Sequence, residues 1–253
     1  MTPQPMIEIR GLTKAFAGQP VLRGVDMTVP EGMVTAVIGK SGEGKSVLLK
    51  HIIGLLKPDA GDILFQGRSL AEVGLAERRA FRRRCSYMFQ NMALFDSLTV
   101  FDNIALPLRE TARMAEAETA RRVGVLAERL ELVGILEKFP SQISGGMQKR
   151  VALARALVTE PGLVLFDEPT TGLDPIRKSA VLSLIDQSRK RFGFTAVLVS
   201  HDIPDVFDVA GHVAMLDAGR IVWEGSAEAI VACQDPVVRR FLSGQPDPDA
   251  ADA

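Results

Sequence analysis

Gly39-Lys40-Ser41-Gly42-Glu43-Gly44-Lys45-Ser46 matches the pattern GxxxxGK[ST], and this stretch decides the fold. The apolar run Val34–Ile38 before it predicts a buried strand, and the apolar spacing of Gly44–Leu56 after it predicts a helix. In this order of strand, glycine-rich turn and helix, backbone N–H groups and the helix N-terminus converge and can hold phosphate oxygens. A merely tight strand-to-helix turn is the alternative interpretation. One face of the helix is expected to carry Val47, Leu48, His51, Ile52 and Leu55.

Two acidic residues end another apolar run. Leu163–Phe166 predicts a buried strand, and Asp167 and Glu168 follow it directly. Acids at the tip of a buried strand are costly unless they serve a cation or a reaction. With the phosphate-binding loop they predict a nucleoside triphosphatase, in which Lys45 would reach the β and γ phosphates and Ser46 and Asp167 would hold Mg²⁺. Glu168 would polarise the attacking water as general base, which separates hydrolysis from mere nucleotide binding.

The composition is that of an ordinary globular protein. The chain has 253 residues, with 30 Lys plus Arg, 31 Asp plus Glu and a net charge of -1, and 47% of its residues are hydrophobic. These values exclude a disordered chain and give no general electrostatic reason to bind nucleic acid. No run approaches the roughly 18 to 20 apolar residues needed to cross a bilayer, and residues 1–10 lack a secretory-signal pattern. With only Cys85 and Cys233, we expect no disulfide framework and a reducing cytosol.

Strand and helix patterns alternate along the chain, which is an α/β signature. Asn91–Glu160 has a helical pattern, with a long amphipathic helix expected at Glu116–Leu132, and we interpret this region as a lobe inserted into the α/β core. Gln245–Ala253 is rich in Pro, Asp and Ala and is expected to be a frayed tail. The remaining strands are expected at Met6–Arg10, Val21–Val29, Ala196–Val199 and Val213–Leu216.

A further motif, Ser144-Gly145-Gly146-Met147-Gln148, stands at the expected start of a helix. Together, the three motifs make the chain resemble, over nearly its whole length, the ATP-binding subunits of ABC (ATP-binding cassette) transporters, whose signature is usually written LSGGQ. Met147 and Ile143 depart from that signature, whereas Ser144, Gly145 and Gly146 keep the hydroxyl and N–H groups that can bind an anion. A Ser-Gly-Gly cap of an unrelated helix is the ordinary alternative.

The resemblance implies a fold and a domain order. The fold class is α/β, a P-loop NTPase core of ABC type with an antiparallel β subdomain and an inserted helical subdomain. Residues 1–90 would form the first part of the core, and residues 91–159 the helical subdomain with the signature motif. Residues 160–244 would complete the core, and residues 245–253 would be a flexible tail.

The resemblance also implies ATP and Mg²⁺ as cofactors and assigns roles to single residues. Phe16 would stack on adenine, with core packing as its alternative, and Gln90 would sense Mg²⁺ or the γ-phosphate, with an exposed strand-end amide as its alternative. Asp174, in Gly172-Leu173-Asp174, belongs to the loop that communicates between two nucleotide sites, and His201 would contact the γ-phosphate as a switch rather than act as a structural histidine. His51 and His212 match no such role and are expected to be packing residues.

These assignments define three sets of residues. The catalytic set is Glu168, His201, Gln90 and Lys45. The metal-binding set is Ser46, Gln90 and Asp167. The nucleotide-binding set is Phe16, Gly39, Lys40, Ser41, Gly42, Glu43, Gly44, Lys45, Ser46, Val47, Ser144, Gly145, Gly146 and Asp174.

In this family the signature of one subunit completes the ATP site of another, so the resemblance implies a homodimer. Residues 46–59 and 89–110 are similar to the Mla/Mce phospholipid-transport branch. That branch implies an MlaE-like integral membrane permease, an MCE-domain protein and a STAS-domain subunit as partners, no nucleic acid, and a peripheral position on the cytoplasmic side of the bacterial inner membrane. The alternative is the ATPase of a polar-solute importer. Cassette proteins that remodel ribosomes or DNA usually carry two fused cassettes or long coiled-coil insertions, and neither fits in 253 residues.

Three surface segments keep two interpretations each. The segment Phe95–Leu108 would receive a coupling helix of the permease, or its apolar residues would fill the core of the helical lobe. The segment Asp235–Gly244 predicts a short amphipathic helix that packs against a partner ATPase or against its own core. The basic cluster Arg78–Arg84 forms a solvated helix face or contacts anionic headgroups or nucleic acid.

Overall fold

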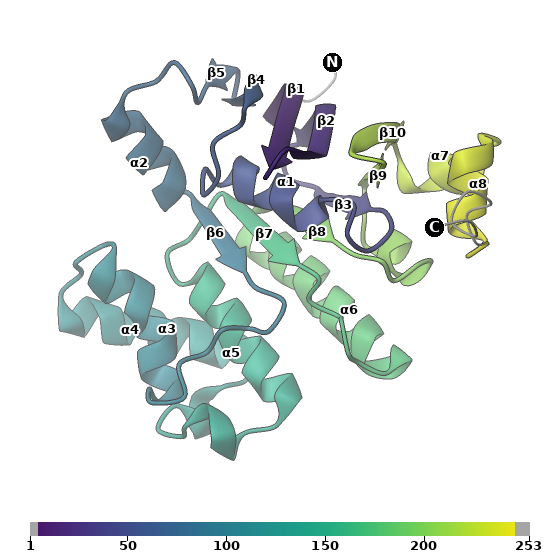
Figure 1. Cartoon of the computed structure of the whole chain (residues 1–253). Coiled ribbons are helices and arrows are strands. Elements are labelled where there is room, and N and C mark those ends of the chain that lie inside the picture. The colour runs from purple at the N-terminus through teal and green to yellow at the C-terminus, as the bar shows by residue number, and fades with distance from the viewer. Residues whose placement is uncertain (1–4, 246–253) are drawn as a thin grey trace.

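The computed structural model describes residues 5–245, and two β-sheets organise this part of the chain (Figure 1). The smaller sheet is antiparallel, in the order β2-β1-β4-β5, and the larger sheet has the order β10-β9-β3-β8-β7-β6. The strands of the smaller sheet are β1 (Pro5–Phe16), β2 (Gln19–Pro30), β4 (Ala60–Phe65) and β5 (Arg68–Ser69). The strands of the larger sheet are β3 (Val34–Ile38), β6 (Cys85–Met88), β7 (Leu163–Asp167), β8 (Thr195–Val199), β9 (His212–Asp217) and β10 (Arg220–Gly225).

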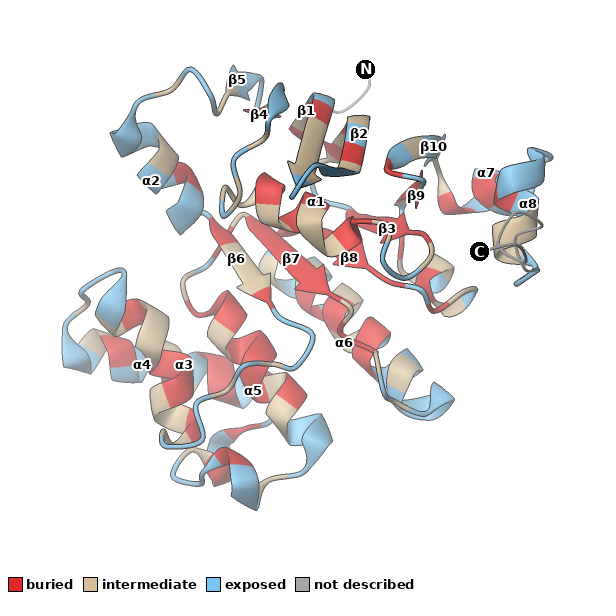
Figure 2. Ribbon diagram, in the orientation of Figure 1, coloured by how far each residue is buried: buried red, intermediate tan, exposed pale blue. Residues whose placement is uncertain are grey.

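The larger sheet is parallel except for β10, which pairs antiparallel with β9. Every residue of β3, β7 and β8 is buried, because both faces of the sheet are covered (Figure 2). Strands buried on both faces have continuous apolar sequences, which is why these strands could be predicted as short apolar runs. Since parallel strands all run the same way, the chain leaves β3, β7 and β8 at one edge of the sheet.

Helices cover the larger sheet on both faces. The α-helices are α1 (Lys45–Ile52), α2 (Leu75–Arg83), α3 (Val100–Glu110), α4 (Glu116–Arg129), α5 (Gly145–Leu157), α6 (Pro175–Phe192), α7 (Ala227–Val231) and α8 (Pro236–Leu242). The 3-10 helices are η1 (Val133–Ile135), η2 (Pro140–Gln142) and η3 (Asp205–Asp208). No helix in residues 5–245 combines the length and apolar character that crossing a bilayer requires.

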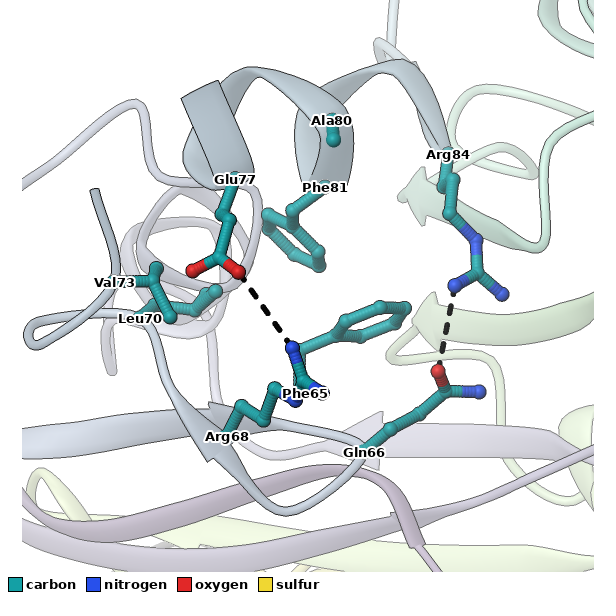
Figure 3. Close-up of a pocket in the computed structure, with 9 residues that line it drawn as sticks. All are labelled: Phe65, Gln66, Arg68, Leu70, Val73, Glu77, Ala80, Phe81 and Arg84. Carbon is teal, nitrogen blue, oxygen red and sulfur yellow. Dashed lines mark hydrogen bonds and ion pairs between the residues drawn. The ribbon is translucent and has the colours of Figure 1, made fainter. Parts of the chain in front are cut away.

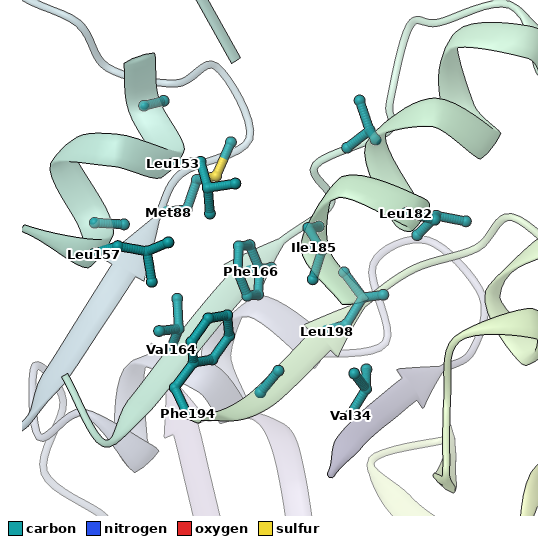
Figure 4. Close-up of a cluster of buried hydrophobic side chains, with 14 of the residues drawn as sticks. Val34, Met88, Leu153, Leu157, Val164, Phe166, Leu182, Ile185, Phe194 and Leu198 are labelled. Atoms are coloured by element: carbon teal, nitrogen blue, oxygen red, sulfur yellow. The ribbon is translucent and has the colours of Figure 1, made fainter. Parts of the chain in front are cut away.

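Alternate residues of each central strand face different cores. On one face, Val164 and Phe166 join Leu198 and side chains of α5 and α6 in a single cluster (Figure 4). On the other face, Leu165 and Val197 join α1 and the smaller sheet, so α1 lies between the two sheets. The helices α3, α4 and α5 lie together beside β6, on the segment between β6 and β7 (Figure 1).

Two helices are shorter than the sequence predicts: α4 ends at Arg129 rather than at Leu132, and α1 is shortened at its C-terminal end. The pattern predicted a helix through Leu56, with Leu55 on the buried face, but α1 ends at Ile52 and Leu55 is 58% exposed. Gly54 adopts φ 72°, a left-handed conformation that ends the helix and turns the following residues away from the core. The prediction for Leu55 is therefore wrong, whereas Leu48, His51 and Ile52 are buried as expected.

The structure also places the three surface segments for which the sequence left two interpretations. Val100 is buried in the core whereas Phe95 is 51% exposed, so the segment Phe95–Leu108 contributes to both core and surface. Val238 of α8 is buried in the chain's own core, with Phe241 and Leu242 packed beside it. Of the basic cluster, Arg78, Arg79, Arg82 and Arg83 lie on α2, and Arg84 is its C-cap. Of the predicted tail Gln245–Ala253, Gln245 is exposed, and residues 246–253 lie outside the described part of the chain.

Candidate active site

Two glycines of the phosphate-binding loop cannot be replaced without moving their neighbours. Gly39, directly after β3, has φ 152°, and a Cβ there would lie 2.2 Å from the carbonyl oxygen of Leu216. Gly44, directly before α1, has φ 97°, and a Cβ there would lie 2.8 Å from Cγ1 of Val21. A positive φ angle and the lack of space for a Cβ atom both require glycine at these two positions. The loop therefore has a fixed shape set by β2 and β9 on either side.

Lys45 begins α1 and folds its side chain back over the loop. Its Nζ donates hydrogen bonds to the carbonyl oxygens of Gly39 at 2.9 Å and Lys40 at 2.7 Å, and the residue is only 4% exposed. Burial lowers the pKa of Lys45, while the carboxylates of Glu168, Glu43 and Asp167 oppose that shift. The ammonium group thus lies at the mouth of the loop, where an anionic phosphate would compensate for the burial.

Ser46 and Asp167 meet beside the loop. The Ser46 hydroxyl donates to Oδ1 of Asp167 at 2.7 Å, although 121 residues separate them in the chain. The hydroxyl of Tyr87 donates to Oδ2 of the same carboxylate, also at 2.7 Å. A carboxylate next to a serine hydroxyl is an oxygen donor set that suits Mg²⁺, which takes its other ligands from water and nucleotide phosphates. These residues fit a magnesium ion.

Glu168 follows Asp167 in a strained conformation with φ 48°. Its N–H donates to the carbonyl oxygen of Val199 at 3.1 Å, and its Oε2 accepts a hydrogen bond from the hydroxyl of Thr171 at 2.9 Å. The Nδ1 atom of His201 lies 3.6 Å from the same Oε2. The structure therefore brings Glu168 and His201 together at the tips of β7 and β8, as the predicted roles of base and switch require.

Four predicted residues are not joined to this cluster by hydrogen bonds in residues 5–245. Phe16 ends β1 and is 42% exposed, and Gln90 is exposed after β6. Ser144 caps α5 by accepting from Met147 N at 3.3 Å, and Asp174 caps α6 by accepting from Arg177 N at 3.1 Å. Within residues 5–245, no hydrogen bond joins any of the four to Lys45 or Asp167. Hydrogen bonds within the described part of one copy therefore do not join the whole predicted set.

A pocket of about 520 Å³ lies away from these residues, between α2 and the smaller sheet (Figure 3). Phe65 and Phe81 make a tilted ring contact in its wall, with ring centroids 4.8 Å apart, and the Arg84 guanidinium lies 4.9 Å from the centre of the Phe65 ring. Arg68 pairs with Glu77 at 3.6 Å across its mouth. Its charged groups already have partners, and we assign it no part in the chemistry.

A glycine-rich loop between a buried strand and a helix, beside a strand tipped by Asp167 and Glu168, defines a P-loop nucleotide hydrolase. The chain belongs to the ABC transporter family, whose model matches residues 22–171. It is the ATP-binding, ATP-hydrolysing subunit of an ABC transporter.

Known proteins resemble the chain over almost all of its length. The intermembrane phospholipid transport system ATP-binding protein MlaF of Escherichia coli is 40% identical over 96% of this chain and 90% of that protein. The probable ribonucleotide transport ATP-binding protein mkl of Mycobacterium tuberculosis is also 40% identical, over 94% of this chain and 67% of that protein. The structure of CbiO1 from Clostridium perfringens, part of the transporter complex CbiONQ, superposes with a TM-score of 0.83 at 28% identity, covering 94% of this chain and 95% of that one.

Two contacts of the site were not predicted from the sequence. Tyr87 reaches Asp167 because β6 pairs with β7, and Tyr87 stands opposite Leu165 in that register. Thr171 reaches Glu168 through the turn that follows β7. The order of strands in the sheet is what brings Tyr87 to the site, and no local pattern of the sequence reports that order.

Proposed function

We propose that the chain drives phospholipid transport between membranes. It would act as a homodimer docked on an MlaE-like permease, in a complex with an MCE-domain protein and a STAS-domain subunit, on the cytoplasmic side of the bacterial inner membrane. The observation that carries this proposal is the 40% identity to MlaF over 96% of the chain. Relatives of two different organisms with that same role, from Escherichia coli and Haemophilus influenzae, support it.

Within this function, the residues of the cluster take the roles that their geometry supports. Lys45 would neutralise the β and γ phosphates, and the loop residues 39–47 would hold them with backbone N–H groups. Ser46, Asp167 and Gln90 would hold Mg²⁺, and the ion would supply positive charge against the phosphates. Gln90 follows soon after Tyr87, whose hydroxyl contacts Asp167. Glu168 would accept a proton from the attacking water, and His201, 3.6 Å away, would orient the γ-phosphate against it.

A second copy of the chain would complete the site. Ser144, Gly145 and Gly146 offer a hydroxyl and the N-terminus of α5 to a phosphate bound by the partner, and Phe16 would stack on adenine. Exposed apolar side chains support such an interface, because Met147 in the signature is 39% exposed and Ile176 after Asp174 is 83% exposed. A second subunit placed on this face would cover both side chains. We also propose the domain order predicted from the sequence, in which residues 91–159 form the helical subdomain between the two parts of the core.

A variant of the proposed base tests the assignment. Glu168→Gln keeps the shape of the side chain but removes its basicity, so it should bind ATP, accumulate as a dimer and hydrolyse about 10² to 10⁴-fold more slowly. Glu137→Gln, at an exposed position far along the chain, is the matched control and should hydrolyse at the normal rate. Near-normal hydrolysis by Glu168→Gln in the purified complex would remove Glu168 from the role of base.

A second candidate function is nucleotide-type solute transport, because the mkl protein named for ribonucleotide transport has the same identity to the chain. Purification of the tagged chain with its native membrane partners separates the two. Copurification of a permease with an MCE-domain protein and bound phospholipid supports the first function. A permease together with a periplasmic solute-binding protein supports the second.

A further inference from the structure

Asp202, the residue after His201, is a buried carboxylate held from two sides. It is 7% exposed, and its two oxygens accept hydrogen bonds from Lys178 Nζ and Thr170 Oγ1. Its own N–H donates to the hydroxyl of Ser200 at 3.0 Å. Burial works against ionisation, but the hydrogen bonds from Lys178 and Thr170 prevail and lower the pKa of Asp202. The carboxylate therefore stays charged at neutral pH.

The two partners of Asp202 come from different functional segments. Thr170 lies in the turn that follows Glu168, the proposed base. Lys178 lies in the first turn of α6, where its N–H donates to the carbonyl oxygen of Asp174 at 3.0 Å. The main chain of Lys178 is thus tied to the Asp174 loop, and its side chain is tied to the residue beside His201.

This ion pair differs from the pair that Lys190 makes near the end of α6. Lys190 pairs with Asp186 at 2.7 Å four residues apart on the same helix, and the Lys190 side chain is 66% exposed. A pair with one strongly exposed partner on the same helix contributes little to stability. The Lys178 side chain is 24% exposed, its partner is 5% exposed, and the pair joins segments 24 residues apart.

We propose that Lys178 is a positioning residue for ATP hydrolysis, which links the Asp174 loop to the His201 loop through Asp202. When a second subunit settles on the Asp174 loop, the first turn of α6 moves with that loop and carries Asp202 and His201 with it. Thr170 binds the same carboxylate, so the segment after Glu168 follows. Lys178 thereby keeps His201 aligned with Glu168 only when the Asp174 loop is in place. The proposal rests on the roles assigned above to Glu168 and His201.

The test compares Lys178→Met, Lys178→Arg and the control Lys190→Met in the full-length chain. For each, the melting temperature, the equilibrium binding of a fluorescent ATP analogue, and kcat and KM for ATP are measured. We expect Lys178→Met to bind the analogue normally and to lose about 10- to 100-fold in kcat, because displaced catalytic groups cost rate rather than affinity. Lys178→Arg should recover most of kcat, and Lys190→Met should match the unmodified chain.

A double variant keeps the test decisive if Lys178→Met folds poorly. Lys178→Met leaves Asp202 as an uncompensated buried charge, which Lys178→Met/Asp202→Asn removes. The double variant should regain the normal melting temperature and keep the low kcat. A kcat of Lys178→Met within about twofold of normal would overturn the proposal. A double variant that regains a normal kcat together with its stability would overturn it as well. A His201→Ala variant with a normal rate would instead refute the assigned site, whatever Lys178 does.

Discussion

Asn103 is fully buried and holds the turn that precedes α3. Its Oδ1 accepts from Phe95 N at 2.9 Å, and its Nδ2 lies 3.0 to 3.1 Å from the carbonyl oxygens of Phe95, Leu98 and Thr99. This turn is the first part of the segment Phe95–Leu108, which was predicted to receive a coupling helix of the permease. Replacement of Asn103 by alanine would release this turn.

The size of the effect follows from these contacts. The Asn103 amide has two N–H hydrogens, which can donate about two bonds at a time to the three carbonyl oxygens. Its Oδ1 accepts one more, so the side chain makes at most three hydrogen bonds at any time. At about 1 kcal/mol each, Asn103→Ala should lower the free energy of unfolding by about 3 kcal/mol. For a chain of this size each kcal/mol corresponds to about 2 to 4 °C, so the melting temperature should fall by about 6 to 12 °C.

Urea and thermal unfolding of the purified chain measure both quantities. Asn91→Ala, an exposed asparagine in the same segment, is the control and should change stability by less than about 0.5 kcal/mol. We also expect Asn103→Ala to keep its basal ATPase rate below its melting temperature but to lose stimulation by the permease. A loss of stability no larger than that of the control would refute the account of this turn.

Three further variants test other parts of the structure. Gly39→Ala should abolish ATP binding, since its Cβ would lie 2.2 Å from a carbonyl oxygen, and equilibrium nucleotide binding measures the loss. Gly124→Ala, in α4 with open space around the new methyl group, should raise the free energy of unfolding by about 0.5 to 1 kcal/mol in urea titrations. Burial lowers the pKa of His51 from 6.5, so the stability that its neutral form contributes is complete above that pH and is lost as the pH falls towards the folded pKa. The free energy of unfolding in urea should therefore change less between about pH 7.5 and about pH 5.5 for His51→Leu than for the unmodified chain. An equal change in the two proteins would contradict the lowered pKa of His51.

The centre of the fold is predictable from the sequence because its strands are buried on both faces. β3, β7 and β8 appear as uninterrupted apolar runs, and the loop glycines after β3 fix where α1 begins. The smaller sheet is less visible. β1 and β2 are each 12 residues long, whereas the predicted strands were Met6–Arg10, the first part of β1, and Val21–Val29 within β2. β4 was not predicted at all.

The candidate site was predictable where chemistry needs a particular residue type. Lys45, Ser46, Asp167, Glu168 and His201 were predicted from motifs, and the structure brings them together. The supporting contacts were not predictable from single motifs. The Lys178–Asp202 pair joins α6 to the loop after β8, and such pairing is decided by how the helix packs on the sheet rather than by residues near either partner.

Phospholipid transfer driven by ATP tests the central claim most directly. The complex that copurifies with the tagged chain would be placed in lipid vesicles, and movement of a fluorescent phospholipid to acceptor vesicles would be followed after addition of ATP and Mg²⁺. We predict transfer that requires ATP and that stops when the chain carries Glu168→Gln. Transfer at the same rate with Glu168→Gln, or ATP-driven uptake of a polar solute with no movement of phospholipid, would contradict the account.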